Sequence, residues 1–231
     1  MIELKFVVDH RTGAVATEAV PRLIAADPVL ARLLAEVERR FEADAAHDLG
    51  HLFRVADWTV RLSGDTEPRT SIAAALLHDV VNVPKNHVDR GVASERSGDV
   101  AREVLPRFGF DADTTELIAE AIVDHSFSRG AVPRTGLGRA LQDADRLEAL
   151  GVIGTFRCIA TGVRFGAHFF DAADPWAVNR PLDDKRFSID HFFTKLLKLP
   201  ETFQTVEGRA EANRRVAIMH ALLAALAAEL A

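Results

Sequence analysis

The segment "AALLHDVVNVPKNHVDR", residues 74–90, holds the polar pair on which the interpretation of the whole chain depends. Nine of the twelve residues over 72–83 are apolar, yet His78 and Asp79 stand near the middle of this run. A solvated helix would spread its polar residues along one side, so the pattern predicts a buried helix instead. A buried carboxylate is costly unless it is hydrogen-bonded, ion-paired or bound to a metal ion.

Most of the chain shows the apolar spacing of amphipathic helices. Asp27 before Pro28 and Asp48 before "LGHLFRVADWTVRL" are typical helix starts, and the helix that begins at Thr70 should end before Pro84. Further helices are expected at 94–107, 113–125, 136–149, 152–165, 189–198 and 207–230, with loops at 128–136 and 171–184.

Only the beginning of the chain has a different pattern. Within residues 2–19, "IELKFVVD" and "AVATEAV" flank "HRTG", which is typical of a short β-hairpin. No internal repeat, low-complexity tract or linker divides the remainder. We therefore expect an N-terminal extension, residues 1–24, followed by one all-α domain, residues 25–231.

Composition limits the classes of protein to consider. Of the 231 residues, 48% are hydrophobic and 27% are charged, as in soluble globular proteins. The net charge of −6 argues against a nucleic-acid surface. The single cysteine, Cys158, excludes an intramolecular disulfide and fits a reducing compartment. There is neither a signal-peptide pattern nor an apolar run of 18 residues, so we expect a cytoplasmic protein that does not span a membrane.

Polar residues interrupt apolar helices at several positions. His51 lies in "GHLFRVADWTVRL", His78 and Asp79 follow, and Asp143 and Asp145 lie in "LQDADRLEALG". Two imidazoles and two carboxylates on three helices can converge on one divalent ion, and this mixed set suits Mn, Fe, Co, Ni, Zn or Mg. Each residue alone could be a hydrogen-bonded core residue, but the ordered series favours a metal site. Asp143 and Asp145 point about 200° apart on a helix, so periodicity does not choose between them.

These residues resemble the HD-domain superfamily of metal-dependent phosphohydrolases, through "HxxRV" at 51–55, "LLHD" at 76–79 and "DADRLEALG" at 143–151. The pieces "AHDLGHLFRV", "LLHDVVNVPKNHVDR", "DHSFS", "QDADRLEALGVIG" and "SIDHFFTKLLKLP" are similar to small stand-alone bacterial HD hydrolases, a group that contains uncharacterised proteins and nucleotide pyrophosphohydrolases. The similarity extends over roughly residues 25–225. It implies an all-helical fold with metal ligands in the pattern H…HD…D.

Applied to this chain, the resemblance implies that one divalent ion is held by His51, His78, Asp79 and Asp145. Asp143 then becomes a neighbour of the ligands or a substrate contact.

Other histidines leave alternatives open. His47 and His51 are spaced i, i+4 and could together hold a metal, although orientation of the site or contact with phosphate is favoured for His47. In relatives with two metals, extra histidines bind the second ion, a role open to His87 and His125. We expect one ion, with His125 lining the pocket.

Cationic side chains near the proposed ligands indicate an anionic substrate, most simply a phosphate. They are Lys85, His87 and Arg90 after the HD pair, and Arg54 and Arg146 beside the ligands. Any of these could instead be a solvated surface charge. On the helix over 189–198, His191, Lys195 and Lys198 share a face that either closes the pocket or is solvated.

The resemblance implies hydrolysis of a phosphate ester or phosphoanhydride in a small phosphorylated molecule, most simply a nucleotide. Asp79 or Asp143 would accept the proton, and Lys85, His87, Arg90 and Arg146 would offset charge on the phosphate. The expected substrate contacts are His47, Arg54, His125, His191 and Lys195, and Glu95 and Glu148 are further candidates for an acid or base. Two alternatives are a di-iron HD-type oxygenase, with His87 and His125 as iron ligands, and a non-catalytic nucleotide-binding sensor.

Overall fold

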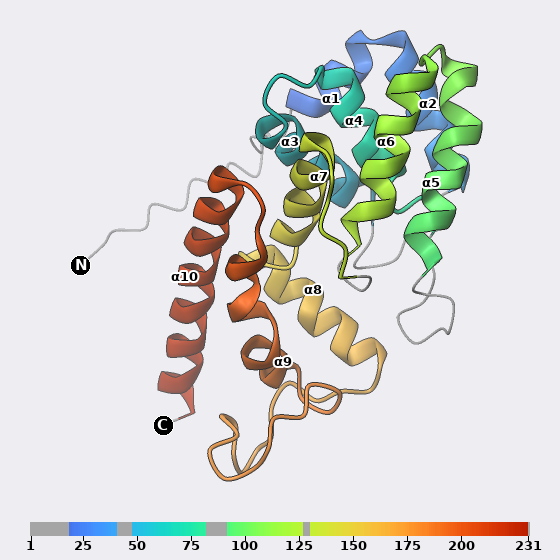
Figure 1. Cartoon of the computed structure of the whole chain (residues 1–231). Helices are drawn as coiled ribbons and strands as arrows, with labels where there is room; N and C mark the ends of the chain where they lie inside the picture. Colours follow the sequence, from blue (N-terminus) through green and yellow to red (C-terminus); the bar gives the residue numbers. More distant parts are fainter. Residues whose placement is uncertain (1–18, 41–47, 82–91, 127–129, 231) are drawn as a thin grey trace, which may run out of the picture.

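The structure is a computed structural model, and it describes residues 19–40, 48–81, 92–126 and 130–230 (Figure 1). Its helices are α1 Ala19–Ala26, α2 Pro28–Arg40, α3 Leu49–Leu62, α4 Pro68–Leu77, α5 Ala93–Val104, α6 Ala112–His125, α7 Gly136–Leu147, α8 Gly151–Arg164, α9 Ser188–Thr194 and α10 Val206–Glu229, with 3-10 helices η2 Leu105–Phe108 and η4 Leu196–Thr202. No β-strand occurs in these ranges, which confirms the expected all-α class for them. The hairpin expected over 2–19 falls on residues 1–18, outside the described part of the chain, and Ala19 already begins α1.

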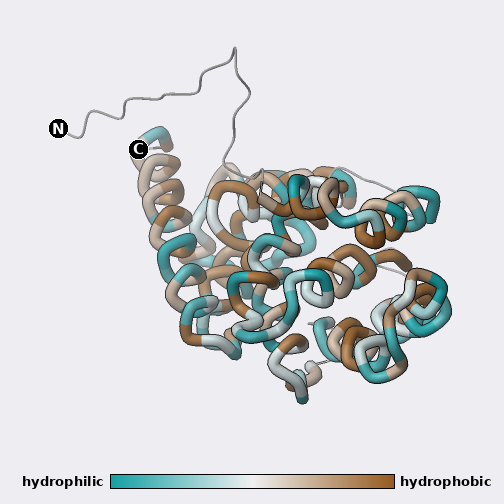
Figure 2. Tube along the Cα trace, turned by 90° about the horizontal axis from the view of Figure 1, so that it is seen from above, coloured by the Kyte–Doolittle hydropathy of each residue, from teal (hydrophilic) through white to brown (hydrophobic). Residues whose placement is uncertain are grey.

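Helices α1 to α7 surround one hydrophobic core, and the chain from the end of α7 to α10 forms a second. Helix α4 is central to the first core, because every residue from Thr70 to Leu77 is buried. Figure 2 shows hydrophilic residues in teal and hydrophobic residues in brown along the helical turns of the tube. Figure 1 shows α8, α9 and α10 together beside the bundle of α1 to α7. Among the described helices, none combines the length and apolarity needed to cross a membrane.

Two expected helices end earlier than their sequence pattern suggests. Helix α4 stops at Leu77 rather than before Pro84, and His78 is its C-cap residue. The expected helix 189–198 breaks at Lys195, where φ is −135° and ψ is −59°, and the chain continues as η4. His191, Lys195 and Lys198 therefore do not share one helical face. Helix α1 was not expected from the sequence, and its Val20 and Ile24 belong to the first core.

A buried ion pair holds the segment between α8 and α9 in place. Arg180 donates to both carboxylate oxygens of Asp190, at 2.5 and 2.9 Å, and the backbone N–H of Asp183 donates to the same group. Burial alone would raise the pKa of Asp190, but the hydrogen bonds from Arg180 and Asp183 hold it below its usual value. The pair thus fixes the loop 171–184 against the start of α9.

Candidate metal centre

The ends of four helices bring the proposed ligands and His125 together. His51 lies in the first turn of α3, where the carboxylate of Asp48 caps the helix by accepting from the His51 backbone N–H at 2.7 Å. His78 caps the C-terminus of α4, and His125 is the last residue of α6. Asp145 lies in the last turn of α7. Because α3, α4, α6 and α7 pack against one another, these side chains meet in the first core.

Inter-atomic distances within the cluster fit a single ion. His78 Nε2 lies 3.5 Å from Asp79 Oδ2 and 3.9 Å from Asp145 Oδ1, and His51 Nε2 lies 3.7 Å from the same Asp145 oxygen. One ligand atom each from His51, His78 and Asp79 can be chosen within 4.8 Å of one another. Donor atoms that share an octahedral ion at about 2.1 Å are roughly 3.0 to 4.2 Å apart. The cluster is therefore close to the size that coordination requires.

Backbone carbonyls set the tautomers of two histidines. His78 Nδ1 lies 2.7 Å from the Ala75 carbonyl oxygen, and His125 Nδ1 lies 2.5 Å from that of Ile122. A carbonyl only accepts, so each Nδ1 carries a proton, and the Nε2 of His78 presents its lone pair to the cluster. The buried Nε2 of His78 has no hydrogen-bond donor among the described residues and faces two carboxylates instead. Lone pairs that face carboxylates without a proton between them suit a cation, so this chain's residues fit a divalent metal ion.

The cluster is closed on its histidine side and open on its carboxylate side. The side chains of His51 and His78 are 1% and 0% exposed, whereas those of Asp79 and Asp145 are 32% and 29% exposed. A small molecule can therefore reach the carboxylates, while the imidazoles are held by the core.

Protonation states agree with metal binding. Burial alone would raise the pKa of Asp79, but the neighbouring imidazoles of His78, His125 and His51 hold it well below its usual range. Burial lowers the pKa of His51, so its imidazole is neutral at pH 7. His125 differs: despite burial, the carboxylate of Asp79, 3.7 Å from Nε2, raises its pKa. His125 therefore belongs to the cluster through Asp79, as a residue that lines the pocket.

An ionic network lies on the Nδ1 side of His51. One of its members, Arg157, was not expected from the sequence. Glu148 Oε2 is 3.3 Å from His51 Nδ1 and accepts from Arg54 Nε at 2.9 Å. Arg157, on α8, lies 2.6 Å from the same Nδ1 through Nη1. Burial would raise the pKa of Glu148, but the bonds from His51 and Arg54 lower it to about 2. Arg54, expected to bind substrate, is therefore engaged with Glu148.

Asp143 lies apart from the cluster. It is fully buried, and its carboxylate accepts from the backbone N–H groups of Gln204 and Thr205 and from the Thr205 hydroxyl, at 2.7 to 3.1 Å. Burial raises the pKa of Asp143, although these hydrogen bonds oppose the rise. Asp143 was expected to accept a proton or to contact the substrate, but these contacts give it a different role. Both of its oxygens hold the chain at the start of α10.

Several other expected site residues have different partners or fall outside the description. Arg146 is buried and donates to the carbonyl of Thr202. His191 pairs with Asp184 at 2.9 Å, Lys195 lies at the end of α9, and the cluster described above includes neither. His47, Lys85, His87 and Arg90 lie outside the described residues.

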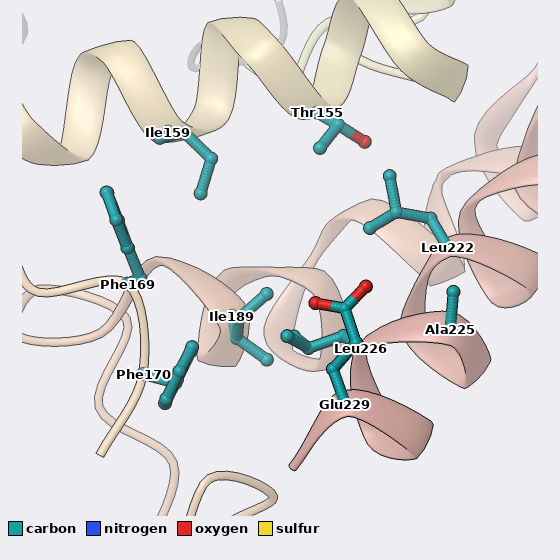
Figure 3. Close-up of a pocket in the computed structure, with 9 residues that line it drawn as sticks. All are labelled: Thr155, Ile159, Phe169, Phe170, Ile189, Leu222, Ala225, Leu226 and Glu229. Atoms are coloured by element: carbon teal, nitrogen blue, oxygen red, sulfur yellow. The ribbon is translucent and has the colours of Figure 1, made fainter. Parts of the chain in front are cut away.

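A separate open cavity of about 350 Å³ lies between α8, α9 and α10 (Figure 3). Its walls are apolar except for Thr155 and Glu229, and they consist further of Ile159, Phe169, Phe170, Ile189, Leu222, Ala225 and Leu226. It shares no residue with the cluster and offers no cation to a phosphate, so it is not part of the candidate metal centre.

Ion binding is expected to stabilise the folded chain. An ion bound only by the native state contributes about 2.7 kcal/mol at a hundredfold excess over Kd. For a chain of this length that is roughly 5–10 °C in melting temperature. Asp79→Asn should remove most of this shift, whereas Asp184→Asn, remote from the cluster, should retain it. Thermal unfolding with chelator and with Mn²⁺, Co²⁺, Ni²⁺, Zn²⁺, Fe²⁺ or Mg²⁺ measures the effect, and identical melting temperatures in all conditions would show that the cluster is purely structural.

Comparisons with known proteins agree with this geometry. The family model of the HD domain matches residues 48–150. The chain is 28% identical over 180 residues to the uncharacterized protein YpgQ of Bacillus subtilis strain 168, covering 75% of this chain and 80% of YpgQ. The crystal structure of YpgQ in complex with ADP matches with a TM-score of 0.66 and 23% identity, over 86% of this chain and 96% of YpgQ. An HD-superfamily hydrolase from Bacillus thuringiensis matches with a TM-score of 0.64 and 26% identity, over 90% and 97%. This chain therefore carries an HD domain at residues 48–150, within the fold of stand-alone HD-superfamily proteins.

Proposed function

We propose that the chain is a divalent-metal-dependent phosphohydrolase that acts on a small phosphorylated molecule, most simply a nucleotide. The observation that carries the proposal is the buried Nε2 of His78, which faces the carboxylates of Asp79 and Asp145 with no donor between them. His51, His78, Asp79 and Asp145 would hold one ion. When bound, the ion supplies Lewis acidity toward water and toward a phosphoryl oxygen.

The chain's own residues would orient the reactants. Asp79 is ionised at neutral pH and partly exposed, so it can accept a hydrogen bond from the attacking water. His125 has a raised pKa next to Asp79 and can donate to a phosphate oxygen. Lys85, His87 and Arg90, expected from the sequence, remain the proposed cations that offset charge on the phosphate.

A nucleotide is supported by the relatives. YpgQ, which this chain resembles in sequence and fold, has been crystallised with ADP. A phosphoanhydride placed at the open, carboxylate side of the cluster would need an ion to screen its charge from Asp79 and Asp145. The proposed reaction is therefore hydrolysis of a nucleotide phosphoanhydride or phosphomonoester.

The test is a screen of purified protein against nucleoside mono-, di- and triphosphates with each divalent ion, together with metal analysis. We expect ion-dependent release of phosphate or pyrophosphate that chelator abolishes. One ion per chain with turnover supports the proposal. Two irons per chain would favour the di-iron oxygenase, and nucleotide binding without turnover would favour a sensor.

A further inference from the structure

The Nδ1 atom of His51 has two neighbours with opposite requirements. Glu148 Oε2, 3.3 Å away, can only accept a hydrogen bond, and Arg157 Nη1, 2.6 Å away, can only donate one. A proton on Nδ1 can be donated to Glu148 but faces the N–H of Arg157. A lone pair on Nδ1 can accept from Arg157 but faces the carboxylate of Glu148. The neutral ring can therefore favour only one of these partners at a time.

We propose that Glu148 is the positioning residue that orients His51 toward the metal ion. Ion binding changes the hydrogen-bond partner of His51 Nδ1 from Arg157 to Glu148. The inference rests on the proposed metal centre but not on hydrolysis. His51 Nε2 points to Asp145 Oδ1 at 3.7 Å, so an ion in the cluster takes the Nε2 lone pair. The single proton of the neutral ring must then lie on Nδ1, where only the carboxylate can receive it.

The surroundings of Glu148 suit this role. Its side chain is 1% exposed, and Arg54 donates to Oε2 from both Nε and Nη2, at 2.9 and 2.8 Å. Two bonds from one guanidinium fix the direction of the carboxylate, and the core on either side prevents it from turning to solvent. Asp145 and Glu148 are three residues apart, so the end of α7 supplies both a metal ligand and the residue that orients another ligand.

Arg157 has a second acceptor, because its Nη1 also lies 3.5 Å from Glu148 Oε2. It comes from α8, which supplies no ligand, and its side chain is 19% exposed. Once Nδ1 carries a proton, the guanidinium loses Nδ1 as an acceptor and keeps the carboxylate of Glu148 as its partner.

Titration calorimetry with Mn²⁺, in the absence of any nucleotide, tests the role of Glu148. Glu148→Ala should bind Mn²⁺ about 10- to 100-fold more weakly than the wild type. Glu148→Gln should lose at most about threefold, because its amide oxygen still accepts the Nδ1 proton. Glu36→Ala is the matched control, since Glu36 is also buried and paired with two arginines, Arg39 and Arg40, but contacts no histidine within the described part of the chain. Unchanged affinity in Glu148→Ala overturns the inference, and so does equal weakening in the Ala and Gln variants, which would show an effect of charge alone.

Crystal structures of the wild type with and without Zn²⁺ give a second test that does not depend on any variant folding. With Zn²⁺, the His51 Nδ1 to Glu148 Oε2 distance should shorten from 3.3 Å to about 2.8 Å, and Arg157 Nη1 should move beyond about 3.5 Å from Nδ1. Arg157 still hydrogen-bonded to Nδ1 beside a bound ion would overturn the inference. A wild type that binds no ion overturns the proposed function as well, whereas ion binding without turnover overturns only the hydrolase.

Discussion

Asp145→Ala is expected to lower the affinity for the divalent ion by more than a hundredfold and to lower kcat/KM for the proposed substrate by about 10³-fold. Loss of a residue that merely orients a metal ligand costs about 10- to 100-fold in affinity, so loss of a ligand should exceed that range. Asp145 Oδ1 is also the atom that both His51 and His78 approach, at 3.7 and 3.9 Å. The substitution therefore removes the negative charge that lies close to both imidazoles.

Metal content after gel filtration and steady-state kinetics with excess ion measure the two effects. Asp184→Ala is a suitable control, because Asp184 is a partly exposed carboxylate that also pairs with a histidine, His191, but lies outside the cluster. The control should keep its ion and its rate. An Asp145→Ala protein that retains a full equivalent of metal would show that this carboxylate is not a ligand.

Asp143→Ala should have the opposite profile, with metal retained and stability lost. The side chain satisfies two backbone N–H groups and one hydroxyl from inside the core, and hydrogen bonds to a charged group are worth about 1.5–3 kcal/mol each without being additive. We expect a loss of about 3 kcal/mol, or roughly 6–12 °C in melting temperature. Urea unfolding in the presence of chelator isolates this effect from any contribution of the ion.

Asp143→Asn provides the graded comparison, because its amide oxygen can still accept from Gln204 and Thr205. Its loss of stability should be less than that of Asp143→Ala, and both variants should bind Mn²⁺ as the wild type does. An Asp143→Ala protein of normal stability that lost its ion would show that the roles of the two aspartates are reversed.

Polar residues of the cluster could be predicted from the sequence because each interrupts an apolar pattern. His51, His78 and Asp79 stand out in this way, and the structure brings them together. Periodicity could not separate Asp143 from Asp145, since the surface that packs against Asp143 comes from Gln204 and Thr205, about sixty residues later. Local pattern contains no information about such distant partners.

Other features were missed for equally physical reasons. The end of α4 was predicted too late, because the apolar run continues after Leu77 while the His78 imidazole bonds back to the carbonyl of Ala75. Arg157 gave no signal, since a single arginine within a mostly apolar stretch of helix is usually a solvated residue. Its link to His51 spans 106 positions and depends on how α8 packs. Arg54 was expected to contact the substrate because of its charge alone, and its partner, Glu148, lies 94 positions away in the sequence.

The position of the cluster at helix ends has a consequence for the order of binding. Helices α4, α6 and α7 all finish there, and the C-terminal end of a helix carries about half a negative charge. These ends add to the negative charge of Asp79 and Asp145, although the start of α3 at His51 has the opposite sign, and the guanidinium of Arg54 is paired with Glu148. In the proposed function, these carboxylates and helix ends would oppose a polyphosphate at the ion-free centre, and a bound ion would offset them. We therefore expect an order of binding in which the metal enters first and the phosphate second.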